Sequence, residues 1–276
     1  ILIRIPFSLT RGNRIRSDVV GRYWASRGYT VVIQGTRGRY ESGGEFYPML
    51  YERQDGIETL HWLEKQPWFN GRLGMWGGSS FGHTQWAVAD QPTLRTGAFF
   101  IQIASTNFRA MFFPGNAFSL ESAVFWTIRS RGERDRPVDN ADLERGVNTL
   151  PVLDADLRAI GDTDFYNDWL LRQNDDDYWG VVDGIKRAQT IQAPVLLLAG
   201  WFDPFLPSQL DDYTTIKKHA DPAVARETRL IIGPWAHAIS RGMPGSTAEN
   251  PYRVASIEPA LSWFDHHLGV SRDSLD

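Results

Sequence analysis

The stretch Gly74-Met75-Trp76-Gly77-Gly78-Ser79-Ser80-Phe81-Gly82-His83 joins an apolar run to a segment, residues 84–89, that has helical character. Its small residues gather around two serines, as expected for a strand-to-helix turn so tight that larger side chains would not fit. A turn of this kind, a nucleophile elbow, presents a serine hydroxyl at the end of a sheet strand. The stretch therefore predicts a catalytic turn, and a plain Gly/Ser loop is the alternative interpretation.

Two serines compete for the role of nucleophile. Gly78-Ser79-Ser80-Phe81-Gly82 is a literal G-x-S-x-G pattern with Ser80 at its centre. The frame Gly77-Gly78-Ser79 instead makes Ser79 the nucleophile, with the next glycine one place late. The residues of the turn alone leave both frames open.

Apolar runs and amphipathic segments alternate on both sides of this turn. Such alternation is typical of an α/β fold, in which helices flank a mostly parallel sheet. Strands are predicted at residues 1–7, 29–34, 73–76, 98–104, 193–200 and 229–233, and helices at residues 17–27, 50–64 and 259–267.

The pattern changes between residues 107 and 188, a region rich in Trp, Phe and acidic residues. No clear strand occurs there, whereas residues 141–147 and 164–172 have helical character. An insertion of this size between two sheet strands predicts a helical cap. We expect residues 1–105 and 190–276 to form the core with the sheet, and residues 106–189 to form the cap.

Composition excludes several classes of protein. Hydrophobic residues make up 42% and charged residues 22%, which is typical of a globular chain. The net charge of −4, without a basic run, argues against a nucleic-acid partner, and no apolar stretch is long enough for a membrane span. Cysteine is absent, so disulfides and thiolate chemistry are excluded.

The chain begins with Ile1 rather than Met and enters a predicted strand at once. We expect it to be a piece of a longer protein. No charged leader precedes the strand, which favours a cytoplasmic location without fixing it.

A serine nucleophile needs a base and an acid that orients the base. The carboxyl ends of parallel strands face one crevice, so both groups are sought just after the later strands. Asp203 follows the strand predicted at 193–200, and His237 follows the strand predicted at 229–233. The chain order Ser, Asp, His is that of α/β-hydrolases. The alternatives are that Asp203, before Pro204, only starts a turn and that His237 is a loop histidine.

The other histidines are weaker candidates for the base. His61 and His83 lie in helical contexts, and His266-His267 falls in the last predicted helix, where a surface position is expected. No spacing resembles a metal-binding motif such as H-E-x-x-H. We therefore expect neither a metal nor another cofactor.

The chain resembles the cocaine-esterase-like hydrolases of the X-Pro dipeptidyl-peptidase superfamily. The matching stretches occur in the family's order over nearly the whole chain: Arg4-Ile5-Pro6-Phe7, Val32-Ile33-Gln34-Gly35-Thr36-Arg37-Gly38, Gln66-Pro67-Trp68, Gly74-Met75-Trp76-Gly77-Gly78-Ser79, Thr84-Gln85-Trp86, Asp177-Tyr178-Trp179, Gly200-Trp201-Phe202-Asp203 and Gly233-Pro234-Trp235-Ala236-His237.

This resemblance implies an α/β-hydrolase fold and a serine esterase mechanism. In the family the nucleophile stands five places after the glycine of the Gly-Met-aromatic run and has a glycine at +3, which selects Ser79. His237 is then the base and Asp203 orients it. The family's C-terminal β-sandwich domain, which helps to close the active site, is expected to be absent from this chain.

The same resemblance implies an oxyanion hole that departs from the family pattern. The N–H of Ser80 supplies one donor, but the family's tyrosine hydroxyl corresponds here to Phe7, which has none. One lost oxyanion donor costs about 10²–10³ in rate. Either a backbone N–H near Phe7 or Ser8 substitutes, or the enzyme is slow.

The expected substrate is a small-molecule ester or amide with an apolar acyl group. Relatives that hydrolyse amino-acid esters place carboxylates two and three positions after the catalytic Asp, where this chain has Phe205 and Leu206. A free ammonium would have no anionic partner there. The aromatic residues expected to line the acyl pocket, or alternatively to pack in the core, are Trp201, Phe202, Phe205 and Trp235.

Three alternatives stay open at this point. The chain is an ester hydrolase, an amide hydrolase of the acylase or X-Pro peptidase type, or a weakly catalytic binding domain with the same fold. The sequence also leaves a homodimer open.

Overall fold

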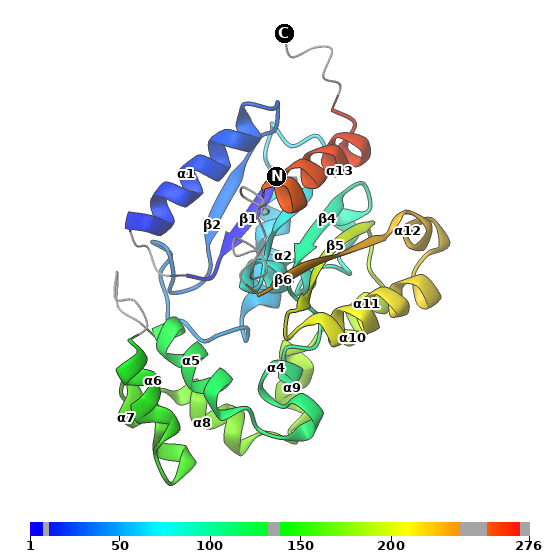
Figure 1. Ribbon diagram of the computed structural model, residues 1–276. Helices are drawn as coiled ribbons and strands as arrows, with labels where there is room; N and C mark the ends of the chain where they lie inside the picture. Colours follow the sequence, from blue (N-terminus) through cyan, green and yellow to red (C-terminus); the bar gives the residue numbers. More distant parts are fainter. Residues whose placement is uncertain (8–10, 132–138, 238–252, 271–276) are drawn as a thin grey trace.

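The fold is built on a six-stranded parallel sheet with strand order β2-β1-β3-β4-β5-β6 (Figure 1). The structure is a computed structural model that describes residues 1–7, 11–131, 139–237 and 253–270, without the side chains of residues 11–16 and 253–254. The strands are β1 Leu2–Ile5, β2 Val32–Gly35, β3 Gly74–Gly78, β4 Ala98–Gln102, β5 Val195–Phe202 and β6 Arg229–Ala236. All six predicted strands are found, although their ends differ from the prediction.

Side chains alternate along each strand and so point to both faces of the sheet, and each face is buried in a hydrophobic cluster. In β4, Phe99 and Ile101 enter one hydrophobic cluster, whereas Ala98 and Phe100 enter the other. Helices cover each face, as Figure 1 shows. Within the described ranges, no helix is long and apolar enough to cross a membrane. One cluster takes residues from α2 Glu52–Glu64, α3 Ser80–Trp86, α10 Ile185–Gln189, α11 Leu206–His219 and α12 Pro222–Glu227; the other takes residues from α1 Arg11–Ala25 and α13 Glu258–Leu268.

Two sheet strands continue past the glycines at which the sequence predicts their ends. Strand β5 runs beyond Gly200 to Phe202, and β6 runs beyond Gly233 to Ala236. The indole of Trp235 packs against both glycines, and a Cβ added to Gly233 would lie 1.9 Å from this ring. These glycines therefore make room for an aromatic ring instead of ending the strands.

The first helix also differs from the prediction. Helix α1 begins at Arg11 and not at residue 17, so Ser17 and Asp18 lie inside the helix instead of at its start. Ser and Asp are favoured at helix starts but are also tolerated inside helices at a modest free-energy cost. The Arg-rich segment before Ser17 also belongs to the helix, since arginine is a good helix former.

The insertion between β4 and β5 is helical in its described residues, and it forms the lower part of the molecule in Figure 1. It has a separate hydrophobic cluster rich in Phe, Trp and Tyr, in which Phe112 stacks on Trp169 with ring centroids 4.2 Å apart. The predicted boundaries at residues 106 and 189 stay a prediction. The α-helices described between β4 and α10 are α4 Arg109–Phe112, α5 Leu120–Arg131, α6 Asn140–Val147, α7 Ala155–Ala159, α8 Asp164–Leu171 and α9 Asp176–Val182.

Candidate active site

Ser79 stands at the sharp turn between β3 and α3. Its backbone has φ 55° and ψ −127°, a conformation that non-glycine residues rarely adopt and that costs about 1–3 kcal/mol. The turn is held by its own backbone: the Ser79 N–H donates to the Gln102 carbonyl (2.9 Å), and the Ser79 carbonyl accepts from Gly82 (2.8 Å) and His83 (3.0 Å). Strain of this kind is the local feature of a nucleophile elbow.

The glycines on either side of Ser79 are required by close contacts. Gly77 has φ 147°, and a Cβ there would lie 2.4 Å from the Cβ of Phe81. A Cβ on Gly82 would lie 2.6 Å from the Cβ of Ala104. These glycines stand two places before and three places after Ser79, so the packing fits the frame with Ser79 at the tip of the turn.

Asp203 and His237 meet Ser79 at the carboxyl edge of the sheet. His237 Nδ1 lies 2.8 Å from Asp203 Oδ2, and His237 Nε2 lies 2.9 Å from Ser79 Oγ. The Asp203 side chain is fully buried, whereas that of His237 is 42% exposed. If Nδ1–H donates to the carboxylate, the lone pair of Nε2 is free to accept the hydroxyl proton.

The carboxylate of Asp203 also shapes its own loop. Its second oxygen, Oδ1, accepts the N–H of Phe205 at 2.8 Å. The interpretation of Asp203 as a turn residue is thus compatible with contact to His237, since each oxygen has its own partner. The ring of Phe205 also lies beside the imidazole of His237, with centroids 5.7 Å apart.

The two residues expected at the oxyanion hole, Ser80 and Phe7, both lie next to the elbow. Ser80 is the first residue of α3 and is buried. The ring of Phe7 packs against Phe81, with centroids 5.4 Å apart, and the guanidinium of Arg129 lies 5.7 Å from the centre of the Phe7 ring. Sequence analysis did not identify Arg129, because it belongs to α5, far away in the chain, and carries no motif. Ser8 lies outside the described residues.

The four aromatic residues expected at the acyl pocket have different surroundings. Trp201 and Phe202, at the end of β5, are 61% and 60% exposed. Phe205 is buried and belongs to the hydrophobic cluster of the helical insertion, so it connects the loop of Asp203 with that region. Trp235 is buried in the core on the face covered by α1 and α13.

A second histidine, His83, lies in α3 just behind the elbow but has a different character. It is buried, and its ring packs on Phe108 with centroids 5.5 Å apart. Burial, and secondarily the positive charges of Arg187 and Arg4, lower the pKa of His83 to about 3. This imidazole therefore stays neutral at physiological pH and is part of the packing behind the site.

Burial of His83 predicts acid sensitivity of the fold. Below pH 6.5 the unfolded chain binds a proton at this residue and the native chain does not, so stability is lost as the pH falls from 6.5 toward 3. His83→Phe should remove this contribution, about 1.4 kcal/mol per pH unit in that window. Urea unfolding of both proteins at about pH 7 and about pH 4.5 measures the difference. His61→Gln, an exposed position on α2, is the control, and equal pH dependence in the wild type and His83→Phe would contradict the prediction.

A parallel sheet with a strained serine, an imidazole and a carboxylate along its carboxyl edge defines the α/β-hydrolase class. The chain has this fold, as the solved structures it resembles also show. The chain belongs to the X-Pro dipeptidyl-peptidase (S15) family, whose model matches residues 1–239.

The chain is similar to one curated esterase in sequence and to several solved hydrolase structures in fold. The chain is 31% identical to the cocaine esterase of Rhodococcus sp. (strain MB1 Bresler) over 90% of its own length and 46% of that protein. An aminopeptidase from a marine sediment Thaumarchaeota archaeon has a TM-score of 0.68 at 20% identity, with 97% of this chain and 49% of that chain covered. A CocE/NonD family hydrolase from Staphylococcus aureus has a TM-score of 0.59 at 17% identity, with 99% and 46% covered. The chain thus spans about half the length of these relatives.

Proposed function

We propose that the chain carries the catalytic centre of a serine hydrolase that cleaves carboxylic esters with an apolar acyl group. The observation that supports this most strongly is the unbroken sequence of hydrogen-bonding atoms from Ser79 Oγ through His237 to Asp203. Membership of a hydrolase family and the identity to cocaine esterase support the same reaction class.

In the proposed mechanism Ser79 Oγ attacks the acyl carbonyl while His237 Nε2 takes the hydroxyl proton. The imidazolium so formed is stabilised by the Asp203 carboxylate on Nδ1. His237 then gives the proton to the departing alcohol, which leaves an acyl group on Ser79. Water, deprotonated by the same imidazole, releases the acid and restores the hydroxyl.

The charge that develops on the carbonyl oxygen needs hydrogen-bond donors. The backbone N–H of Ser80, directly after the nucleophile, is the proposed first donor. Phe7 has a ring beside Phe81 at the elbow but no hydroxyl to offer. A tyrosine at this position would carry its hydroxyl on a ring that already lies next to the turn.

Phe7→Tyr is therefore expected to raise kcat on activated esters, with an upper bound of about 10²–10³, the usual effect of one oxyanion donor. Steady-state kinetics on p-nitrophenyl acetate checks the prediction. Phe81→Tyr, which adds a hydroxyl to the other ring of this pair, is the matched control. Unchanged or lower kcat in Phe7→Tyr would count against the missing donor.

The substrate proposed is a small-molecule ester without a free α-amine. Phe205 and Leu206, the positions where a carboxylate would recognise an ammonium, are both apolar and buried. Burying an unpaired ammonium is costly. Trp201 and Phe202, exposed just before Asp203, are the side chains proposed to contact the acyl group.

Hydrolysis of p-nitrophenyl acetate and butyrate by the wild type and by Ser79→Ala tests the proposal. Turnover that depends on Ser79, with butyrate favoured, is expected. Equal rates in the two proteins would contradict the esterase proposal and favour a binding domain with the same fold.

The family name favours a second candidate, hydrolysis of amides or peptides. A dipeptidyl p-nitroanilide with proline in its second position, with and without an acetylated amine, discriminates between the two. Cleavage of the anilide only when its amine is free would favour the peptidase. Hydrolysis of esters that carry no free amine favours the esterase.

A further inference from the structure

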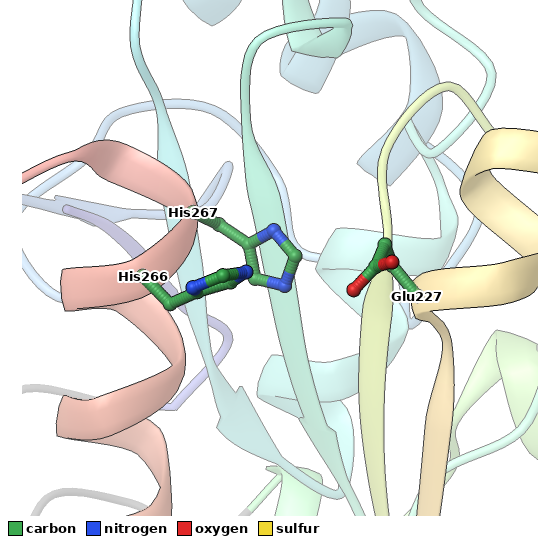
Figure 2. A group of neighbouring side chains, drawn as sticks. All are labelled: Glu227, His266 and His267. Carbon is green, nitrogen blue, oxygen red and sulfur yellow. The ribbon is translucent and has the colours of Figure 1, made fainter.

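Two adjacent histidines and a glutamate from a distant part of the sequence gather away from the catalytic edge of the sheet. Glu227, His266 and His267 each offer one ligand atom, and these atoms all lie within 4.8 Å of one another. Figure 2 shows the imidazole of His267 between His266 and the Glu227 carboxylate. Two imidazoles and a carboxylate form a donor set that suits a borderline divalent cation such as Zn²⁺.

The position of this cluster differs from that of the triad. Glu227 ends α12 two residues before β6 begins, so it lies at the amino edge of the parallel sheet. Ser79, Asp203 and His237 follow the carboxyl ends of their strands. A cation here would be remote from the reacting atoms.

The backbone and core fix the helix that carries the two imidazoles. His266 and His267 lie in the last turn of α13, which is anchored by buried Phe264 and Leu268. Arg72 Nη1 also donates to the Leu268 carbonyl at 2.8 Å. The C-terminal end of a helix carries a partial negative charge, which favours a cation near these residues.

His267 offers a nitrogen that the protein itself leaves unused. Its Nε2 atom is buried and has no hydrogen-bond partner among the described residues. A buried polar atom without a partner destabilises a fold, and a metal ion would give this nitrogen a partner.

Nearby positive charges oppose a cation. Arg226 Nε lies 3.6 Å from Glu227 Oε1. The positive charge of Arg229 disfavours a further positive charge at His267. The Arg226 side chain is 72% exposed, so its ion pair with Glu227 is weak and can be displaced.

We propose that Glu227, His266 and His267 bind one Zn²⁺ ion that joins the end of α13 to the end of α12. Tetrahedral Zn²⁺ with bonds of about 2.0–2.1 Å needs ligand atoms about 3.3 Å apart, so the cluster must contract. Exposed His266 and partly exposed Glu227 have room for the necessary rotations. Water completes the coordination, and the role of the ion is structural.

The test uses protein dialysed against EDTA and then titrated with Zn²⁺ by calorimetry. One ion per chain is expected, with an affinity reduced at least tenfold in His267→Gln and in Glu227→Gln. Arg226→Gln should strengthen binding, because it releases Glu227. Zn²⁺ should also raise the Tm of the wild type, but not that of Glu227→Gln.

Two controls separate this cluster from other imidazoles. His61→Gln removes an exposed imidazole that also lies near a glutamate, Glu58 at 3.9 Å, and His237→Gln removes the imidazole of the triad. Neither should change the affinity. No binding in the wild type, or wild-type affinity in both His267→Gln and the exposed variant His266→Gln, would overturn the proposal.

Discussion

Ser79→Ala is expected to lower kcat on p-nitrophenyl butyrate by a factor of about 10⁵–10⁶, the loss that follows removal of the nucleophile from a serine triad. KM should change little, because the hydroxyl takes no part in holding the acyl group. Alanine removes only the hydroxyl, so the hydrogen bonds of the Ser79 backbone to Gln102, Gly82 and His83 can persist. The lost rate therefore reports on chemistry and not on the shape of the turn.

Ser80→Ala is the matched control for this experiment. Ser80 is adjacent, buried and also a serine, but its proposed contribution is a backbone N–H that alanine retains. We expect this variant to keep activity within about tenfold of the wild type, far above Ser79→Ala. The opposite ranking would mean that the literal G-x-S-x-G frame is the catalytic one.

Asp203→Asn is expected to lower kcat by about 10⁴ without unfolding the chain. The amide oxygen can still accept the N–H of Phe205, which keeps the loop in place. Its NH₂ group would then face His237 Nδ1 and favour the tautomer with the proton on Nε2. That tautomer cannot accept the proton of Ser79, so the base is lost while the geometry is kept.

Asp212→Asn provides the comparison for Asp203→Asn, because Asp212 is also a buried carboxylate, on α11. It accepts the N–H of Thr106 at 2.9 Å, and its side-chain hydrogen bonds within the described part of the chain go to Thr106 and not to the triad. Stopped-flow and steady-state rates on the same ester compare the two variants. Similar losses in both, or a loss below about tenfold in Asp203→Asn, would contradict the role proposed for Asp203.

The sheet and the three candidate residues could be predicted from the sequence because the signals are local or ordered. Apolar runs such as residues 98–102 in β4 mark buried strands, and Asp203 and His237 follow two such runs. Parallel topology then brings the ends of separate strands to one edge. The tight turn was recognisable because close contacts allow only glycine at positions such as Gly77.

Other features depend on tertiary packing that no local pattern contains. The ends of β5 and β6 were placed too early because the glycines serve the ring of Trp235. The contact of Arg129 with Phe7 joins α5 to the loop after β1 and has no sequence signal. Sequence analysis predicted only a surface position for His266 and His267, since their neighbour Glu227 lies on another element.

Labelling with a fluorophosphonate, followed by peptide mass spectrometry, tests the central claim most directly. The reagent forms a covalent phosphonyl ester only with a serine hydroxyl that an adjacent base activates. The account predicts one adduct per chain, on Ser79, and a large loss of labelling in His237→Gln. An adduct on Ser80, or no adduct on a chain that is folded, would contradict it.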